Sequence, residues 1–303
     1  MLNFKPLTPA DFPRLEKYFQ NQPHQLCAYS LASVIAWSNE IYQPYATLDD
    51  DILMICAEYA TEYEKRHLIL PMASDRQFDP QTIHKLAEKA GFAKYQFVPD
   101  DYITTYGRDR IETLFTIEEH TEYDDYIYLA SDLAQLGGNR FAKKRNLIRQ
   151  FERSHVETDR VQVEPMTSAV SGECIEFLEK WCETRDCEAV DSDLLCEKLA
   201  ALKTIENLEL MDMRGLLLRI DGAVSAFGMA SHLTNEMGVL HFEKAFAEVK
   251  GLYQYFDRLC ARRLFEGYTY INKESDMNEP GLKKAKRSYH PVKLVKSYTL
   301  RLK

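Results

Sequence analysis

Short apolar runs bounded by turn residues recur along the chain, and each predicts a β-strand. YATLDDDILMICAEY (residues 45–59) predicts two strands around an acidic turn. Two apolar runs flank Asp221-Gly222, a two-residue turn signal, and therefore predict a hairpin. Further strands are expected in the sequences HLILPMA, KYQFVP, RVQVEPM, MGVLHFEKAF and YTYINKE.

Helical periodicity appears between these runs. Thr8 is placed to cap a helix that starts at Pro9, and residues 82–90 form a short amphipathic helix ended by Gly91. In residues 140–153, the apolar side chains fall on one helical face and the basic ones largely elsewhere. We therefore expect a basic helix that joins two halves of the chain.

The second half begins with a strand and a helical stretch, and then runs hairpin, strand, helix, strand. This is the order of the GNAT fold (Gcn5-related N-acetyltransferase, an acyl-CoA N-acyltransferase fold). The first half also reads as an α+β unit. We expect an α+β protein in which each half is a mixed sheet flanked by helices and the second half follows the GNAT-like order.

Charge is distributed unevenly over the 303 residues, whose formal net charge is -9. Residues 140–153 (RFAKKRNLIRQFER) carry six basic side chains and one acidic, and residues 280–303 carry eight basic side chains and no acidic one. If the fold brings the two segments together, they form a basic groove for phosphates. The candidates for nucleic-acid contact are Lys143, Lys144, Arg145 and Arg149. The alternative is two solvated surfaces.

Composition excludes several classes of protein. No apolar run reaches the length of a membrane span, and the N-terminus lacks an apolar signal core, so a cytoplasmic protein is expected. The seven cysteines are odd in number and form no CxxC pair, which disfavours a disulfide framework or a zinc ribbon. No metal-binding His pair, GxSxG, P-loop or dinucleotide motif is present.

Four segments carry a resemblance to a known family: CAYSLASVIAW, DYIYLASDLAQLGGNRFAKKRN, HFEKAFAEVKGLYQ and NKESDMNEPGLKKAKRSYHP. They resemble a bacterial family of unknown function related to the C-terminal domain of phosphatidylglycerol lysyltransferases. The resemblance implies tandem GNAT-like domains, as in aminoacyl-tRNA-dependent transferases of the Fem type. We expect an N-terminal GNAT-like domain over residues 1–139, a basic connecting helix over 140–158, and a C-terminal GNAT-like domain with the active cleft over 159–303.

In GNAT proteins the donor's phosphates meet a Gly-rich turn at a helix N-terminus, where backbone N–H groups favour anions. Lys250, Gly251 and Tyr253 occupy this turn here. The turn has fewer glycines than an acetyl-CoA loop, which favours a bulkier donor such as the tRNA end. An ordinary turn at a helix start is the alternative.

His241 and Glu243 are two residues apart on one predicted strand, so both are expected to face the same side. If that side faces the cleft, one of them is a candidate general base for an acceptor amine or hydroxyl. The alternative is that one half of this strand is simply polar.

The loop after the last strand of the GNAT-like order is acidic. Glu274 and Asp276 are candidates for binding the α-amine or the lysine ε-amine of an aminoacyl group, or alternatively cap the next helix. Arg287 follows as a further donor-binding candidate, and Lys286 is expected to neutralise a phosphate or an oxyanion. Tyr289 is a candidate proton donor to the leaving group, or a core aromatic residue.

These observations leave three hypotheses open. The first is an aminoacyl or acyl transferase that uses aminoacyl-tRNA or acyl-CoA as co-substrate, has no tightly bound cofactor, and works by direct attack because no activated nucleophile is apparent. Its acceptor is an unknown amine or hydroxyl, which includes a lipid headgroup. The second is a degenerate module that binds an anionic ligand or RNA. The third is an acetyl-CoA-dependent N-acetyltransferase of a small amine.

Overall fold

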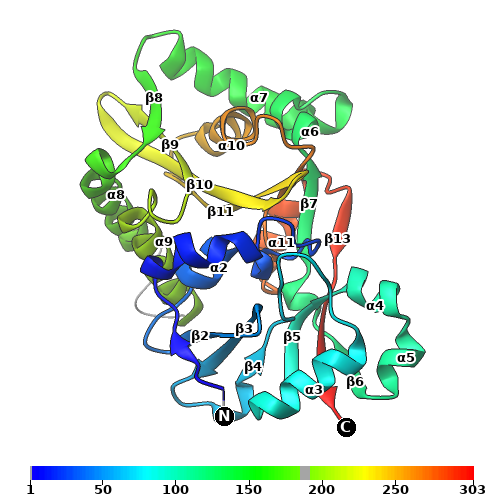
Figure 1. Cartoon of the computed structure of the whole chain (residues 1–303). Helices are drawn as coiled ribbons and strands as arrows, with labels where there is room; N and C mark the ends of the chain where they lie inside the picture. Colours follow the sequence, from blue (N-terminus) through cyan, green and yellow to red (C-terminus); the bar gives the residue numbers. More distant parts are fainter. Residues whose placement is uncertain (1, 185–191) are drawn as a thin grey trace.

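The computed structural model describes residues 2–184 and 192–303, and places them in two seven-stranded mixed sheets (Figure 1). Cys187 lies outside the described residues. The strands of sheet A, in spatial order, are β1 (Lys5–Pro6), β2 (Tyr42–Asp49), β3 (Ile52–Tyr59), β4 (His67–Leu68), β5 (Lys94–Pro99), β14 (Ser297–Leu302) and β6 (Phe115–Glu119). Those of sheet B are β13 (Lys293–Val295), β7 (Asp125–Leu129), β12 (Tyr270–Asn272), β11 (Met237–Ala245), β10 (Ala223–Thr234), β9 (Arg214–Ile220) and β8 (Val161–Met166).

The two sheets exchange one strand each. Strand β7 comes from the first half of the chain but lies between β12 and β13 of sheet B. Strand β14 comes from the C-terminal segment but lies between β5 and β6 of sheet A. A division of the chain into residues 1–139 and 159–303 therefore separates each sheet from the strand next to one of its edges, β14 in sheet A and β7 in sheet B.

Helices cover both sheets and the space between them. They are α1 (Phe12–Leu15), α2 (Leu31–Ala36), α3 (Pro80–Ala90), α4 (Asp100–Tyr106), α5 (Arg108–Glu112), α6 (Ala130–Gln135), α7 (Ala142–Phe151), α8 (Ser171–Glu183), α9 (Ser192–Glu206), α10 (Leu252–Arg263) and α11 (Pro280–Arg287). Figure 1 shows α2 between the two sheets and α10 on the opposite side of sheet B. One buried apolar cluster contains side chains of both halves, among them Tyr29, Phe115 and Phe242, so the sheets share a core.

Several local predictions are confirmed. Asp221 and Gly222, both with positive φ, form the turn of the β9–β10 hairpin, and the acidic turn Asp50-Asp51 joins β2 to β3. Gly91 ends α3 in the left-handed conformation. The expected strand over residues 67–73 is mostly wrong, since only His67–Leu68 form β4, with one isolated bridge between Leu53 and Met72.

The basic segments at residues 140–153 and 280–303 meet in space. Lys144 of α7 donates a hydrogen bond to Ser288 Oγ at 2.8 Å, and its Nζ lies 3.2 Å from the ring centroid of Tyr289. Phe141 packs edge-on against His290, with ring centroids 5.3 Å apart. The N-terminal part of α7 therefore lies against the end of α11.

Candidate functional site

A β-bulge in sheet B sets the direction of His241. Met229 pairs with Phe242 and Ala230 pairs with Leu240, so His241 is the extra residue of β11. The bulge breaks the alternation of side chains along the strand. His241 bonds residues on the α2 side of the sheet, whereas Glu243 bonds residues on the α10 side. The prediction that His241 and Glu243 face the same side is therefore wrong.

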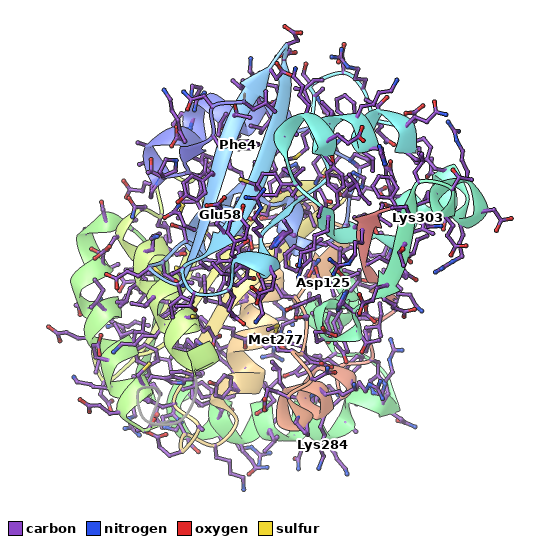
Figure 2. The ribbon with its side chains drawn as sticks, turned by 90° about the horizontal axis from the view of Figure 1, so that it is seen from below. Phe4, Glu58, Asp125, Met277, Lys284 and Lys303 are labelled. Carbon is purple, nitrogen blue, oxygen red and sulfur yellow. The ribbon has the colours of Figure 1, made fainter. Side chains whose placement is uncertain are left out.

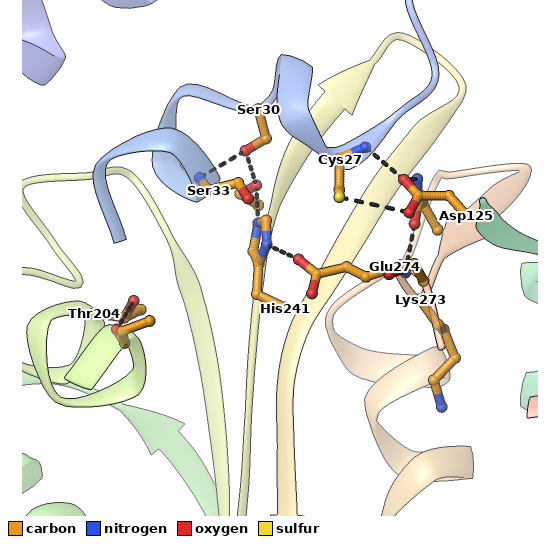
Figure 3. Close-up of polar contacts among 12 residues, drawn as sticks. Cys27, Ser30, Ser33, Asp125, Thr204, His241, Lys273 and Glu274 are labelled. Carbon is orange, nitrogen blue, oxygen red and sulfur yellow. Dashed lines mark hydrogen bonds and ion pairs between the residues drawn. The ribbon is translucent and has the colours of Figure 1, made fainter. Parts of the chain in front are cut away.

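His241 lies in a chain of hydrogen bonds that crosses between the two halves (Figure 3). Its Nε2 is 2.7 Å from Ser231 Oγ on β10, and its Nδ1 is 2.8 Å from Glu274 Oε1. Ser231 Oγ is in turn 2.9 Å from the hydroxyl of Ser30, the N-cap residue of α2. The His241 side chain is only 2% exposed. An imidazole held between a carboxylate and a hydroxyl is the usual arrangement of a general base.

The loop that carries Glu274 has a strained backbone. Glu274, Met277 and Asn278 have φ values of 57°, 49° and 59°, which non-glycine residues rarely adopt. Asp276, which is buried, accepts hydrogen bonds from the Tyr126 hydroxyl and from the backbone N–H of Asn278. Asp276 therefore fixes the turn before α11, whose N-cap residue is Glu279.

Lys286 holds the same loop from α11. Its ammonium donates to the carbonyl oxygens of Lys273 at 2.5 Å and Glu274 at 3.1 Å, and also to that of Ser275. Burial lowers the pKa of Lys286 below that of an ordinary lysine. Three N–H donors meet three carbonyls, so a phosphate finds no free N–H on this side chain in the observed conformation.

A second buried acid lies where β7 enters sheet B. Asp125 Oδ2 accepts hydrogen bonds from the backbone N–H of Cys27 at 2.6 Å and from Asn272 Nδ2 at 2.7 Å. Asn272 Oδ1 accepts from the N–H of Glu274 at 2.6 Å. Burial raises the pKa of Asp125 to about 6. These bonds connect the N-terminal segment, the exchanged strand β7 and the Glu274 loop.

A separate charged cluster is buried on the α10 side of sheet B. Lys273 Nζ lies 3.0 Å from Glu243 Oε2 and 2.7 Å from Asp257 Oδ1. Burial alone would lower the pKa of Lys273, but the two carboxylates outweigh it and the pKa rises. Burial and the Asp257 charge raise the pKa of Glu243. Burial, with a hydrogen bond to Asp257, also raises the pKa of Tyr289 well above that of an ordinary tyrosine.

The predicted donor turn lies at the start of α10, against α7. A Cβ on Gly251, whose φ is +84°, would stand 2.2 Å from the carbonyl oxygen of Leu147. Lys250 is exposed and lines a pocket of about 450 Å³ together with Gln150, Arg153 and His155. The Tyr253 hydroxyl accepts a hydrogen bond from Trp181 Nε1 at 3.3 Å. The turn therefore borders a pocket on one side and is closed by α7 on the other.

The predicted nucleic-acid contacts divide into two kinds. Lys143 and Arg149 are exposed on α7, and Arg287 is exposed on α11. Arg145 instead donates to the carbonyl oxygens of Leu136 at 2.5 Å and Gly138 at 2.6 Å. Burial lowers the pKa of Lys144 to about 8, and its ammonium is engaged by α11.

Comparisons with known proteins assign the chain to a family. Residues 25–301 match the family described as phosphatidylglycerol lysyltransferase, C-terminal. The chain belongs to this family. A search of curated proteins gave no match.

Solved structures confirm the fold of this family member. A conserved protein of unknown function from Bacteroides thetaiotaomicron is 27% identical, with a TM-score of 0.89 over 100% of both chains. The C-terminal domain of a proposed lysylphosphatidylglycerol synthetase from Agrobacterium fabrum is 13% identical, with a TM-score of 0.65 over 96% of this chain and 91% of that one. FemX is 10% identical, with a TM-score of 0.58 over 100% of this chain and 98% of that one. The predicted α+β fold with two GNAT-like domains in tandem is confirmed.

Residues 2–184 and 192–303 contain neither a membrane-spanning helix nor a metal-binding cluster. No helix there combines the length and the apolar character that crossing a bilayer requires. The same residues contain no group of three or more His, Cys, Asp or Glu side chains arranged to hold a metal ion.

Reasoning from the sequence missed several polar residues of this family member's site, namely Ser30, Asp125, Ser231, Asp257, Asn272 and Lys273. In the structure, Ser231 pairs with Val239 between β10 and β11, and the neighbouring bulge turns His241 toward Ser231. No hairpin between these two strands was predicted from the sequence, and the bulge has no sequence mark. Asp125 and Ser30 come from the other half of the chain, and no local pattern indicates that they join this site.

Proposed function

We propose that the chain is an acyltransferase that moves an aminoacyl group from an activated donor, with aminoacyl-tRNA favoured, to an amine or hydroxyl acceptor. The observation that carries this proposal is the strained loop that Lys286 holds and that directs Glu274 to His241. Strain of this kind persists where the surrounding structure enforces it, and it is typical of functional sites. Membership of the lysyltransferase family and the FemX-like fold support a transfer reaction.

In this proposal, His241 is the base and Glu274 orients it. Glu274 accepts from Nδ1, which leaves Nε2 to receive a proton. Asp125, through Asn272, holds the backbone of Glu274 in place. Direct attack by the acceptor stays a prediction, and the hydroxyl nearest to this base is that of Ser231, 2.7 Å from Nε2.

The basic surface favours a tRNA donor over a coenzyme A donor. Exposed cations of α7 and α11, such as Lys143, Arg149 and Arg287, lie on segments that contact each other. The same contact places α7 across the start of α10, where Leu147 closes one side of the donor turn. A lipid headgroup remains among the proposed acceptors, because the family is named for phosphatidylglycerol lysyltransferase.

Equilibrium binding to charged tRNA, uncharged tRNA and acetyl-CoA at low and moderate salt tests the donor. We expect a preference for charged tRNA that weakens as salt rises, because cations on the surface contact phosphates. Binding of acetyl-CoA alone would contradict the tRNA donor and support a small-molecule acetyltransferase. Salt-sensitive RNA binding without any transfer would instead support a binding module.

The variant Glu274→Gln tests the base. We expect the rate of transfer from the charged donor to fall by about 100-fold or more, because a neutral amide does not orient the imidazole for proton uptake. Glu279→Gln is the matched control, since Glu279 is an exposed acid of the same loop. This control should change the rate by about twofold at most, as is usual for surface substitutions. Equal rates for the two variants would remove the role of Glu274.

A further inference from the structure

Both nitrogens of His241 are occupied in the structure. Nδ1 bonds Glu274 and Nε2 bonds Ser231, so the imidazole itself presents no free lone pair to a substrate. The next atom along the hydrogen-bonded chain is Ser231 Oγ. A substrate that uses this base therefore meets the serine hydroxyl first.

Glu274 determines which atom donates in each hydrogen bond between Glu274, His241 and Ser231. A carboxylate only accepts hydrogen bonds, so Glu274 requires the proton of the neutral imidazole to be on Nδ1. Nε2 is then an acceptor, and Ser231 is its donor at 2.7 Å. Two other acceptors lie within reach of Ser231, the hydroxyl oxygen of Ser30 at 2.9 Å and the carbonyl oxygen of His232 at 3.3 Å, and both are farther away than Nε2. Nε2 needs a donor and Ser231 supplies it, so Ser30 donates to Ser231 in this arrangement. The hydroxyl proton therefore points to the base.

We propose that Ser231 is the nucleophile of a Ser231–His241–Glu274 triad and takes the acyl group of an oxoester donor as a covalent acyl-serine. Serine, base and orienting acid are the geometry by which such triads are recognised on unrelated folds. The proposal rests on the proposed acyl transfer, since it gives that reaction its first step. It also adds an activity, hydrolysis of the acyl-serine by water when no acceptor is bound.

The two half-reactions balance through His241. In the first, Ser231 Oγ bonds the carbonyl carbon while its proton moves to Nε2. The bond from that carbon to the donor's ester oxygen breaks, and the oxygen leaves as an alcohol with this proton. In the second, the acceptor amine or hydroxyl bonds the carbonyl carbon and gives a proton to Nε2. The Ser231 ester bond breaks, and the proton returns to Ser231 Oγ.

Nearby groups distinguish Ser231 from other nucleophiles. Burial and the charge of Asp125 raise the pKa of the Cys27 thiol well above its ordinary value, so Cys27 stays protonated. Ser225, on the same strand and equally buried, bonds only the carbonyl of Ala223 among the contacts described. The Ser231 hydroxyl instead lies beside a base, His241, and beside a second hydroxyl, that of Ser30.

Labelling of the whole chain with a fluorophosphonate, which modifies serines activated by a base, tests the proposal. The modified peptide is identified by mass spectrometry, so the wild-type protein alone gives the result. We expect modification at Ser231 in the wild type and no modification in Ser231→Ala. In His241→Gln, the rate of labelling should fall by about 100-fold or more. Ser225→Ala is the matched control and should be labelled like the wild type. Thermal unfolding of each variant checks that it is folded.

The outcomes separate this inference from the proposed function. Modification at Ser231 that depends on His241 supports the triad, whether or not charged tRNA binds. Failure of the wild type to label, in a preparation that transfers an aminoacyl group, would overturn the triad and leave the transfer reaction standing with Ser231 as a proton relay. Modification at another serine, or labelling of Ser231 that His241→Gln does not slow, would also overturn it.

Discussion

The two sheets share one strand order, but their parallel strand pairs bury different side chains. In sheet A, β4 and β5 meet at Leu68 and Tyr95, both fully buried. In sheet B, β11 contains His241, and Lys273 and Glu274 directly follow β12. All three side chains form hydrogen bonds or ion pairs. The same topology therefore serves as apolar packing in one half and as a polar site in the other.

The helices that follow these strands differ in the same way. Helix α3 begins at Asp79, whose carboxylate accepts the N–H of Thr82 at 2.8 Å. Helix α10 begins at Gly251, which has no side chain to cap it. An acid of the chain itself thus occupies the anion-favouring end of α3, while the end of α10 borders a pocket with Lys250 and Arg153. Of these two helix ends, that of α10 is the one without an acidic side-chain cap.

Figure 2, a view from below, shows Asp125 and Met277 near the middle of the molecule. The N-terminal half contributes directly to the site. The segment before α2 provides the backbone N–H of Cys27, which bonds Asp125, and the hydroxyl of Ser30, which bonds Ser231. The first half therefore supplies Cys27, Ser30 and Asp125 to a site whose other polar groups, His241 and Glu274 among them, come from the second half.

The largest expected effect tests the closure of the α10 turn by α7. Gly251→Ala adds a Cβ that meets the backbone oxygen of Leu147, in a residue with positive φ. We expect the free energy of unfolding to fall by about 3–5 kcal/mol, from strain and overpacking together. Gly91→Ala is the control in sheet A's helix, with positive φ but no atom within 4 Å, and should cost only about 1 kcal/mol. Denaturant unfolding measures both, and equal losses would show that α7 does not close the turn.

His67 predicts acid sensitivity for the apolar half. This fully buried imidazole is surrounded by aromatic rings, and burial lowers its pKa from 6.5 to about 4. The unfolded chain then binds the proton more tightly, so stability is complete above pH 6.5 and falls as the pH drops toward 4. We expect this residue to account for about 3 kcal/mol of that loss. The loss in free energy of unfolding between pH 7 and pH 4 should be smaller in His67→Gln than in the wild type by this amount. An equal loss in the two proteins would contradict the prediction.

Asp125 predicts the opposite slope for the polar half. Burial raises its pKa from 3.8 to about 6, so here the folded chain binds the proton more tightly. The contribution to stability is complete below pH 3.8 and declines by about 3 kcal/mol as the pH rises through 6. Asp125→Asn should remove this decline. If the pH dependence of unfolding is the same in the variant and the wild type between pH 4 and 7, Asp125 does not titrate as proposed.

The smallest expected effect concerns the cap of α3. Asp79→Ala leaves the N–H of Thr82 without its side-chain acceptor and should lower the free energy of unfolding by about 1 kcal/mol. It should not change binding of the donor, because sheet A's helix end is not the anion site. Weaker binding of charged tRNA by this variant would place an anion site in both halves and undo the contrast between them.

The sequence allowed the local elements to be predicted and left their long-range pairing open. Turn chemistry at Asp221-Gly222 and the cap at Gly91 act within a few residues, so the pattern is sufficient there. The exchange of β7 and β14 depends on pairing between segments far apart in the chain, and both strands read locally like any other strand. The role of Lys286 was equally hidden, because its three acceptors are backbone carbonyls.

The exchanged strands have a consequence for synthesis of the protein on the ribosome. Sheet A has a place between β5 and β6 that only residues 297–302 fill, and these are made after every other strand. The first half therefore emerges with two unpaired strand edges and keeps them until residues 297–302 have been made. Folding of sheet A is expected to wait for this strand, and a nascent chain stalled before Ser297 is expected to need a chaperone to stay in solution.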